Sequence, residues 1–190
     1  MSKLFMASLP GTLASSGMSG SYLLPLIRKV RTTEFESDKD RIKLLGDRNP
    51  GLGKLRQWVK KRSSPEDTLI LSGKSLGAVK ICLDVLGPDW TRYEYLRVGL
   101  LTVDPWGQRY GWHRHWGMGS IRLPAGLLSR GDGKGFWGFN VVQRNRGLKG
   151  ATVAGVETLV LKDRSVRHGD IVFQPEVRDK LVELVGWALG

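Results

Sequence analysis

Residues 93–100 read YEYLRVGL, and here the spacing of the apolar side chains changes from a helical period to a period of two. Leu96, Val98 and Leu100 alternate with smaller or more polar residues, which is the pattern of a β-strand. Helical spacing dominates before this stretch, and further strands are predicted after it, over residues 119–123, 136–143, 153–161 and 170–173. Because helices and strands do not alternate, this order favours an α+β fold with a mainly antiparallel sheet of about five strands over a series of βαβ units.

Helices are expected on the N-terminal side of this stretch and at the C-terminus. The first begins at Ser37 and ends before a turn at 47–51, and the second runs from Leu52 to Arg62. The third begins at Ser64-Pro65 and ends at Ser72-Gly73, and the fourth runs from Leu76 to Leu86. A closing helix begins at Pro175. Cys82 lies on the apolar stripe of the 76–86 helix. We therefore predict that it is a buried core residue and not a nucleophile.

The first 33 residues are interpreted as a flexible basic arm that is rich in Ser and Gly. Residues 1–33 contain Lys3, Arg28, Lys29 and Arg31 and no acidic residue, and residues 1–21 follow neither a helical nor a strand period. We expect this arm to drive self-association into a homo-oligomer. The remainder, residues 34–190, is long enough to form a single compact α+β domain.

The chain carries a large excess of positive charge. Thirty Lys and Arg residues against 18 Asp and Glu residues give a net charge of +12 and a pI near 10.1. Residues 105–150 contain eight basic residues and one acidic residue, Asp132, which gives a local excess of +7. Such an excess predicts an anionic partner, either an anionic lipid surface or RNA in a ribonucleoprotein, although surface charge that only aids solubility is the alternative.

Two regions supply the candidate contacts to that partner: the 52–62 helix and the 105–150 segment. The basic residues expected to bind it are Lys54, Arg56, Lys60, Lys61, Arg62, Arg109, Arg114, Arg130, Lys134, Arg144, Arg146 and Lys149, and the expected aromatic contacts are Trp58, Trp112 and Trp116. Tryptophan rings suit stacking on unpaired bases or insertion at a membrane interface. A place in the protein core is the alternative for all three.

No catalytic residue is assigned from the sequence, no Gly-x-Ser-x-Gly nucleophile elbow is recognised in it, and neither a cofactor nor a metal is expected. His113 and His115 form a His-x-His pair, but zinc needs a third protein ligand and the remaining histidine is His168. Residues 130–135, Arg-Gly-Asp-Gly-Lys-Gly, lack the spacing of a Walker A loop. An enzyme whose site forms only in three dimensions stays open as a third function.

In size, basic character, tryptophan content and outline, the chain resembles the matrix proteins of enveloped negative-strand RNA viruses. The resemblance rests on the arm 1–33, the 52–62 helix and the tryptophan-rich predicted sheet. It implies a non-enzymatic structural protein that binds an anionic membrane or ribonucleoprotein and self-associates. A sequence-tolerant RNA-binding protein, nucleocapsid-like or ribosome-associated, is the alternative.

A cytoplasmic location, or a peripheral one at the inner face of a membrane, is expected. No apolar run approaches the ~18–20 residues that span a bilayer, so the chain is predicted to be neither transmembrane nor secreted.

Overall fold

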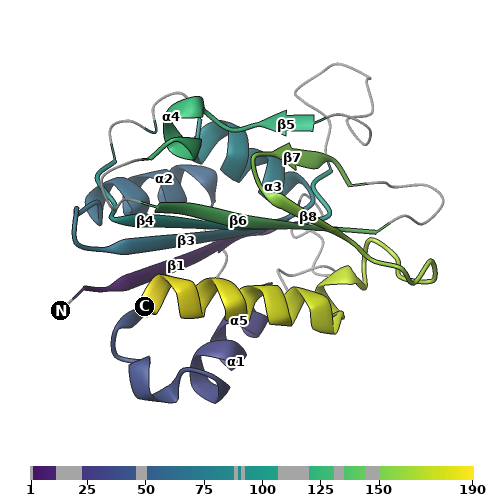
Figure 1. The fold of residues 1–190 in the computed structure, drawn as a ribbon, viewed down its shortest axis with the longest axis horizontal. Coiled ribbons are helices and arrows are strands. Elements are labelled where there is room, and N and C mark those ends of the chain that lie inside the picture. The colour runs from purple at the N-terminus through teal and green to yellow at the C-terminus, as the bar shows by residue number, and fades with distance from the viewer. Residues whose placement is uncertain are drawn as a thin grey trace.

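Six parallel strands form the centre of the fold (Figure 1), in a computed structural model that describes residues 2–11, 23–45, 51–87, 90, 93–106, 120–130, 135–143 and 150–190. The strands are β1 (Leu4–Leu9), β2 (Ile42–Leu44), β3 (Thr68–Lys74), β4 (Arg97–Val103), β6 (Gly135–Val142) and β8 (Glu157–Val160). Their order across the sheet is β2-β1-β3-β4-β6-β8, and every pairing is parallel. The prediction of a mainly antiparallel α+β sheet is therefore wrong, and the fold is α/β.

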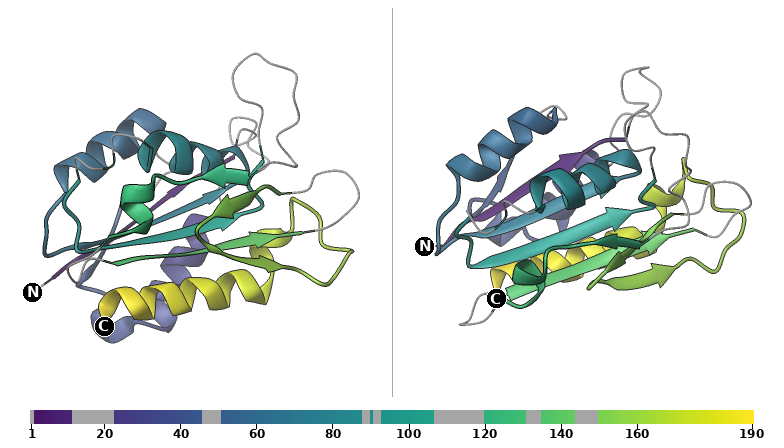
Figure 2. Two further views of the ribbon diagram at one scale, coloured as in Figure 1. Left: turned by 45° about the horizontal axis from the view of Figure 1, so that its top comes forward. Right: turned by 90° about the horizontal axis from the view of Figure 1, so that it is seen from above.

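Helices cover both faces of the sheet, as is usual for parallel sheets. The helices α1 (Leu23–Thr33) and α5 (Pro175–Leu189) cover one face, while α2 (Leu52–Lys61), α3 (Leu76–Lys80) and α4 (Ala125–Leu128) lie over the other (Figures 1 and 2). The π-helical turns η3 (Ile81–Val85) continue α3, and a small parallel sheet of β5 (Ser120–Arg122) and β7 (Thr152–Ala154) lies over the same face. The 3₁₀ turns η2 (Glu36–Asp38) and η5 (Ile171–Phe173) complete the described elements.

Alternate residues of each strand supply two separate apolar cores. Leu69 and Leu71 of β3 pack beneath α2 and α3, whereas Ile70 packs on the side of α1 and α5. Since both faces are buried, the strands have nearly continuous apolar sequences instead of alternating ones. This pattern explains why β1 and β3 were not recognised as strands.

The predicted flexible arm is wrong for the described part of residues 1–33. Residues 4–9 form β1, which is buried along its whole length and pairs with β2 and β3 inside the sheet. Leu23, Ile27 and Val30 of α1 are buried against the second core. These residues thus belong to the folded core, while residues 12–22 lie outside the described residues.

Four other predictions from the sequence are wrong. Ser64-Pro65 begins a turn, closed by a bond from Asp67 N to Ser64 O, and not the expected helix. The segment after Ser37 forms η2 and then β2, because β1 offers it a parallel partner. Residues 170–173 form η5 instead of a strand. The predicted strand 153–161 is divided into β7 and β8 at Gly155, whose φ is +87°.

The predictions that rest on a pattern within a single segment are confirmed for three helical stretches and one strand. The helix predicted over 52–62 is α2, the helical stretch over 76–86 is α3 followed by η3, and the closing helix is α5. The strand read from residues 96–100 is β4. Cys82 is buried, as predicted.

Candidate active site

The carboxyl ends of the six central strands lie at one edge of the sheet, on the right in Figure 1. The direction in which strands are added reverses between β1 and β3, because β2 lies on one side of β1 and all later strands lie on the other. Open parallel sheets bind ligands outside the carboxyl ends of their strands at such a reversal. The residues that follow β1 and β3 lie at this reversal, and those that follow β4 and β8 lie at the same edge of the sheet.

Ser75 follows β3 in a sharp turn that leads directly into α3. Its φ of 53° and ψ of −129° form a backbone conformation that residues other than glycine rarely adopt. Residues 73–77, Gly-Lys-Ser-Leu-Gly, have the Gly-x-Ser-x-Gly spacing of a nucleophile elbow, in which a strained strand-to-helix turn presents a serine above the sheet. Spacing, backbone conformation and structural context all agree with that motif.

The two outer glycines of this turn let backbone segments approach one another closely. A Cβ at Gly73 would lie 2.6 Å from the backbone N and Cα of Ala78. A Cβ at Gly77 would overlap the carbonyl oxygens of Leu9 and Pro10. Since backbone atoms cause both clashes, no side chain can rotate away to make room. The turn is fixed between β1 and α3.

Asp104 follows β4, the strand next to β3, and is completely buried. Its carboxylate oxygen Oδ2 accepts hydrogen bonds from His168 Nδ1 at 2.5 Å and from Gln143 Nε2 at 3.2 Å. Gly150 packs against the other oxygen, Oδ1, so closely that a Cβ at this glycine would overlap it. The carboxylate is thus held in one orientation from two sides.

His168 comes from the segment after β8, and its ring is oriented by Asp104. Because an ionised carboxylate can only accept, Nδ1 carries the proton in the bond between them, and Nε2 is the acceptor of the neutral ring. The ring also packs edge-on against the indole of Trp106, with centroids 6.3 Å apart. An imidazole held in this way can take a proton from a hydroxyl group.

Hydrogen bonds tie the Ser75 turn to the chain on either side of Asp104. Ser75 N donates to Val103 O at 3.0 Å, and Ser75 Oγ donates to Trp106 O at 3.3 Å. The serine is therefore locked to the end of β4, which also carries the buried carboxylate.

Lys74 joins the same turn to the segment that carries the histidine. Its Nζ donates to the carbonyl of Gly169, the residue after His168, at 3.0 Å. Burial lowers the pKa of Lys74, while the negative charges of Asp104 and Asp170 act in the opposite direction. The serine, the carboxylate and the imidazole thus belong to one connected cluster at the edge of the sheet.

Backbone groups near Ser75 could stabilise negative charge on a reacting oxygen. The N–H of Leu76 lies in the first turn of α3, where N–H groups have no partner within the helix. Gly11, which follows β1, approaches so closely that a Cβ there would lie 3.0 Å from Ser75 Cβ. In nucleophile elbows the oxyanion hole uses the N–H after the serine and a second one from the loop after a neighbouring strand. The geometry around Ser75 suits acyl transfer.

Comparison with protein-family models, with curated proteins and with solved structures finds no match to the chain. The resemblance to viral matrix proteins is therefore untested, and the α+β outline on which it partly rested is wrong. Within the described part of the chain, no helix is both long and apolar enough to cross a bilayer. No three His, Cys, Asp or Glu side chains among the described residues form a cluster that could hold a metal ion.

The helix α2 carries most of the described residues that were predicted to bind an anionic partner. Leu55 and Val59 are fully buried, and the half-buried Trp58 packs edge-on against Phe5 with centroids 5.6 Å apart. The apolar stripe of α2 therefore packs on the sheet, and its basic face is left exposed. The exposed basic residues are Lys54, Arg56, Lys60, Lys61 and Arg62. Their binding to an anionic surface or RNA stays a prediction.

Arg130 is partly exposed and also makes a contact within the fold. Its side chain is half-buried, Nη2 donates to the carbonyl of Tyr95, and burial lowers the pKa of the guanidinium. This arginine contacts the backbone just before β4, and its binding to an anionic partner stays a prediction. The other predicted contacts, Arg109, Arg114, Lys134, Arg144, Arg146, Lys149, Trp112 and Trp116, lie outside the described residues.

Sequence reasoning missed Ser75, Asp104 and His168. The signal for the serine was present, because residues 73–77 have the Gly-x-Ser-x-Gly spacing. The prediction that the sequence contains no such elbow is therefore wrong, as is the prediction that a helix ends at Gly73. No role was predicted for Asp104 or His168. Neither carries a local signal, since they are 64 residues apart and meet only through the parallel sheet.

Proposed function

We propose that the protein is a serine hydrolase that cleaves an ester or a related acyl bond. Ser75 is the nucleophile, His168 the general base and acid, and Asp104 the residue that orients the imidazole. The observation that carries the proposal is the 2.5 Å bond between Asp104 Oδ2 and His168 Nδ1, beside a serine in a strained strand-to-helix turn. The chain order Ser, Asp, His is also the order found in α/β-hydrolases.

In the proposed reaction the Ser75 hydroxyl turns from the carbonyl of Trp106 toward His168 Nε2 and attacks the acyl carbon. The proton passes to Nε2, and the buried carboxylate of Asp104 stabilises the positive charge that forms on the ring. The imidazolium then protonates the leaving alcohol, which leaves an acyl group on Ser75. Water, deprotonated by the same nitrogen, releases the acid and regenerates the serine.

The strained turn supports this proposal because it keeps the Ser75 hydroxyl from capping α3. An unstrained serine at the start of a helix would be drawn into capping the helix, whereas the φ of 53° turns Ser75 out of helical geometry. Leu76 N–H and the loop at Gly11 then flank the oxygen of the tetrahedral intermediate. Donors fixed in advance at this position are worth about 10²–10³-fold in rate in enzymes of this kind.

A fluorophosphonate probe tests the assignment of Ser75. We expect the wild-type protein to be labelled at Ser75, as read by peptide mass spectrometry, and to hydrolyse 4-nitrophenyl butyrate. Ser75→Ala should abolish labelling and lower the hydrolysis rate by about 10³-fold or more, because the nucleophile is lost.

The matched control is Ser129→Ala, at an exposed serine that ends α4 and whose Oγ donates to Ala125 O. This variant should be labelled and should hydrolyse the ester like the wild type. Labelling that persists in Ser75→Ala, or a wild-type protein that is neither labelled nor active on esters, would contradict the proposed function.

A further inference from the structure

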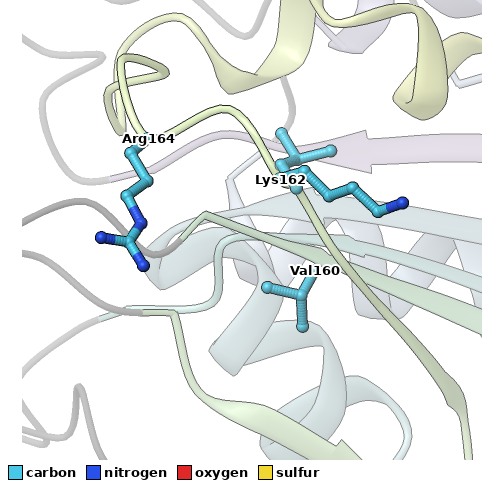
Figure 3. A pocket seen from close by; sticks show the side chains of 4 residues that line it. Val160, Lys162 and Arg164 are labelled. Atoms are coloured by element: carbon cyan, nitrogen blue, oxygen red, sulfur yellow. The ribbon is translucent and has the colours of Figure 1, made fainter.

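A hollow of about 340 Å³ opens beside the end of β8, within the range of volumes of small-molecule sites (Figure 3). Val160 and Leu161 at the end of the strand give it an apolar wall, and Lys162 and Arg164 of the following segment also line it. The combination of apolar surface and positive charge is the feature that points to a ligand class.

The two cations of this hollow have no counterion among the described residues. Lys162 and Arg164 are exposed, and neither makes a hydrogen bond or ion pair in the described part of the chain. The acid between them, Asp163, is engaged elsewhere, because its Oδ1 accepts bonds from both the N and the Oγ of Ser165 at 2.7 Å. The hollow therefore keeps its positive charge available for a ligand.

The hollow adjoins the candidate active site through β6. Val160 pairs with Val142, and Leu161 N donates to the carbonyl of Val142 at 2.9 Å. The next residue, Gln143, donates to the Asp104 carboxylate that holds His168. One strand spacing, about 4.8 Å, thus separates the end of β8 from the chain that contacts the buried acid.

We propose that this hollow binds a negatively charged group of the substrate, so that the enzyme acts on esters that carry a carboxylate or phosphate beside an apolar part. The inference rests on the proposed hydrolase function. Lys and Arg form charge-assisted hydrogen bonds to both kinds of anion, and the apolar wall accommodates the chain that carries them. The net charge of +12 would also attract such substrates over a longer range.

Matched esters test the proposal. The substrates are 4-nitrophenyl butyrate, which is neutral, the 4-nitrophenyl monoester of glutaric acid, which carries an anion on the acyl side, and the butyrate ester of 3-carboxy-4-nitrophenol, which carries it on the leaving group. We expect kcat/KM to be higher by about tenfold or more for one of the two anionic esters, and the favoured ester identifies the side that faces the hollow. Inhibition by inorganic phosphate compared with glutarate identifies the preferred anion.

The double variant Lys162→Gln/Arg164→Gln should lose this preference and retain the rate of the neutral ester. Its control, Lys3→Gln/Lys43→Gln, removes the same charge at two exposed lysines, one just before β1 and one in β2 opposite Phe5 of β1, at the edge where the strands begin, and should retain both rates. Equal rates of neutral and anionic esters in the wild type, or equal loss of preference in both double variants, would overturn the proposal and leave the hydrolase function standing. A wild-type protein that neither hydrolyses any ester nor reacts with fluorophosphonate would overturn both.

Discussion

Among the described residues other than glycine, Ser75 and Asp104 have a positive φ, of 53° and 46°. A residue other than glycine in such a conformation costs about 1–3 kcal/mol and persists only when its surroundings fix it. Here a bond from Ser75 N to Val103 O holds one side, and bonds from Ala78 N and Val79 N to Ser75 O hold the other. Strain maintained at a serine, beside a buried Asp–His pair, agrees with the proposed role of Ser75 as a nucleophile.

Asp104→Asn tests the role of the buried carboxylate. An amide cannot be ionised, so it can no longer stabilise the imidazolium or fix the tautomer with the proton on Nδ1. We expect kcat for ester hydrolysis to fall by about 10⁴-fold while the melting temperature changes little. Asp179→Asn, at an exposed acid of α5, is the control and should keep full activity. Wild-type kcat in Asp104→Asn would remove this residue from the mechanism.

At the scale of elements, the helices α2 and α5 and the strand β4 could be predicted from sequence, whereas the strands β1 and β3 and the helix α1 could not. The stripes of α2 and α5 repeat within the helix itself, so a single segment contains the whole signal. The sequence of β1, Leu-Phe-Met-Ala-Ser-Leu, becomes a strand because it lies between Ile42–Leu44 and Thr68–Gly73, which are remote in sequence. A short apolar run covered on both faces has no period that distinguishes it from other buried segments.

The elbow between β3 and α3 is the element on which the site depends, and Gly77→Ala tests it. The new Cβ would overlap backbone carbonyls of residues 9 and 10, so either β1 or α3 must shift. We expect a loss of stability of about 1–3 kcal/mol, as for other overpacked positions, with loss of ester hydrolysis. Urea unfolding and the 4-nitrophenyl butyrate assay measure the two effects.

Gly53→Ala is the matched control for that substitution. Gly53 lies inside α2 and a Cβ there meets nothing within 4 Å. Because alanine is the better helix former, this change should raise stability by up to about 1 kcal/mol and leave activity intact. If Gly77→Ala and Gly53→Ala changed the free energy of unfolding and the rate of ester hydrolysis equally, the close backbone approach at Gly77 would not be needed for either.

Across the whole molecule, the sheet separates two apolar layers. The layer on the side of α2 and α3 encloses the thiol of Cys82 and the hydroxyl of Tyr95, and both keep their protons at neutral pH. Burial raises the pKa of the Cys82 thiol to about 12 and also raises the pKa of the Tyr95 hydroxyl. The Tyr95 hydroxyl donates to Val59 O at 2.7 Å. The folded protein therefore holds these two protons more tightly than the unfolded chain does.

This difference predicts how stability depends on alkaline pH. Between pH 9, the ordinary pKa of the thiol, and about 12, the unfolded chain releases the Cys82 proton and the folded protein keeps it. The contribution of the buried thiol is therefore fully present below pH 9, and the free energy of unfolding falls as the pH rises through this window, by about 1.4 kcal/mol per pH unit. The lowered pKa of Lys74 acts in the opposite sense, since the unfolded chain then holds the extra proton.

Cys82→Ala isolates the thiol from these other groups, because Lys74 and Tyr95 contribute equally to the variant and to the wild type. At neutral pH the variant should be less stable, since it removes a buried sulfur from the core. The difference in the free energy of unfolding, measured in urea at several values from about pH 8 to about pH 11, should become smaller as the pH rises. A difference that stays constant over this range would mean that the thiol ionises as readily in the folded protein as in the unfolded chain, and that Cys82 is not enclosed by the layer of α2 and α3.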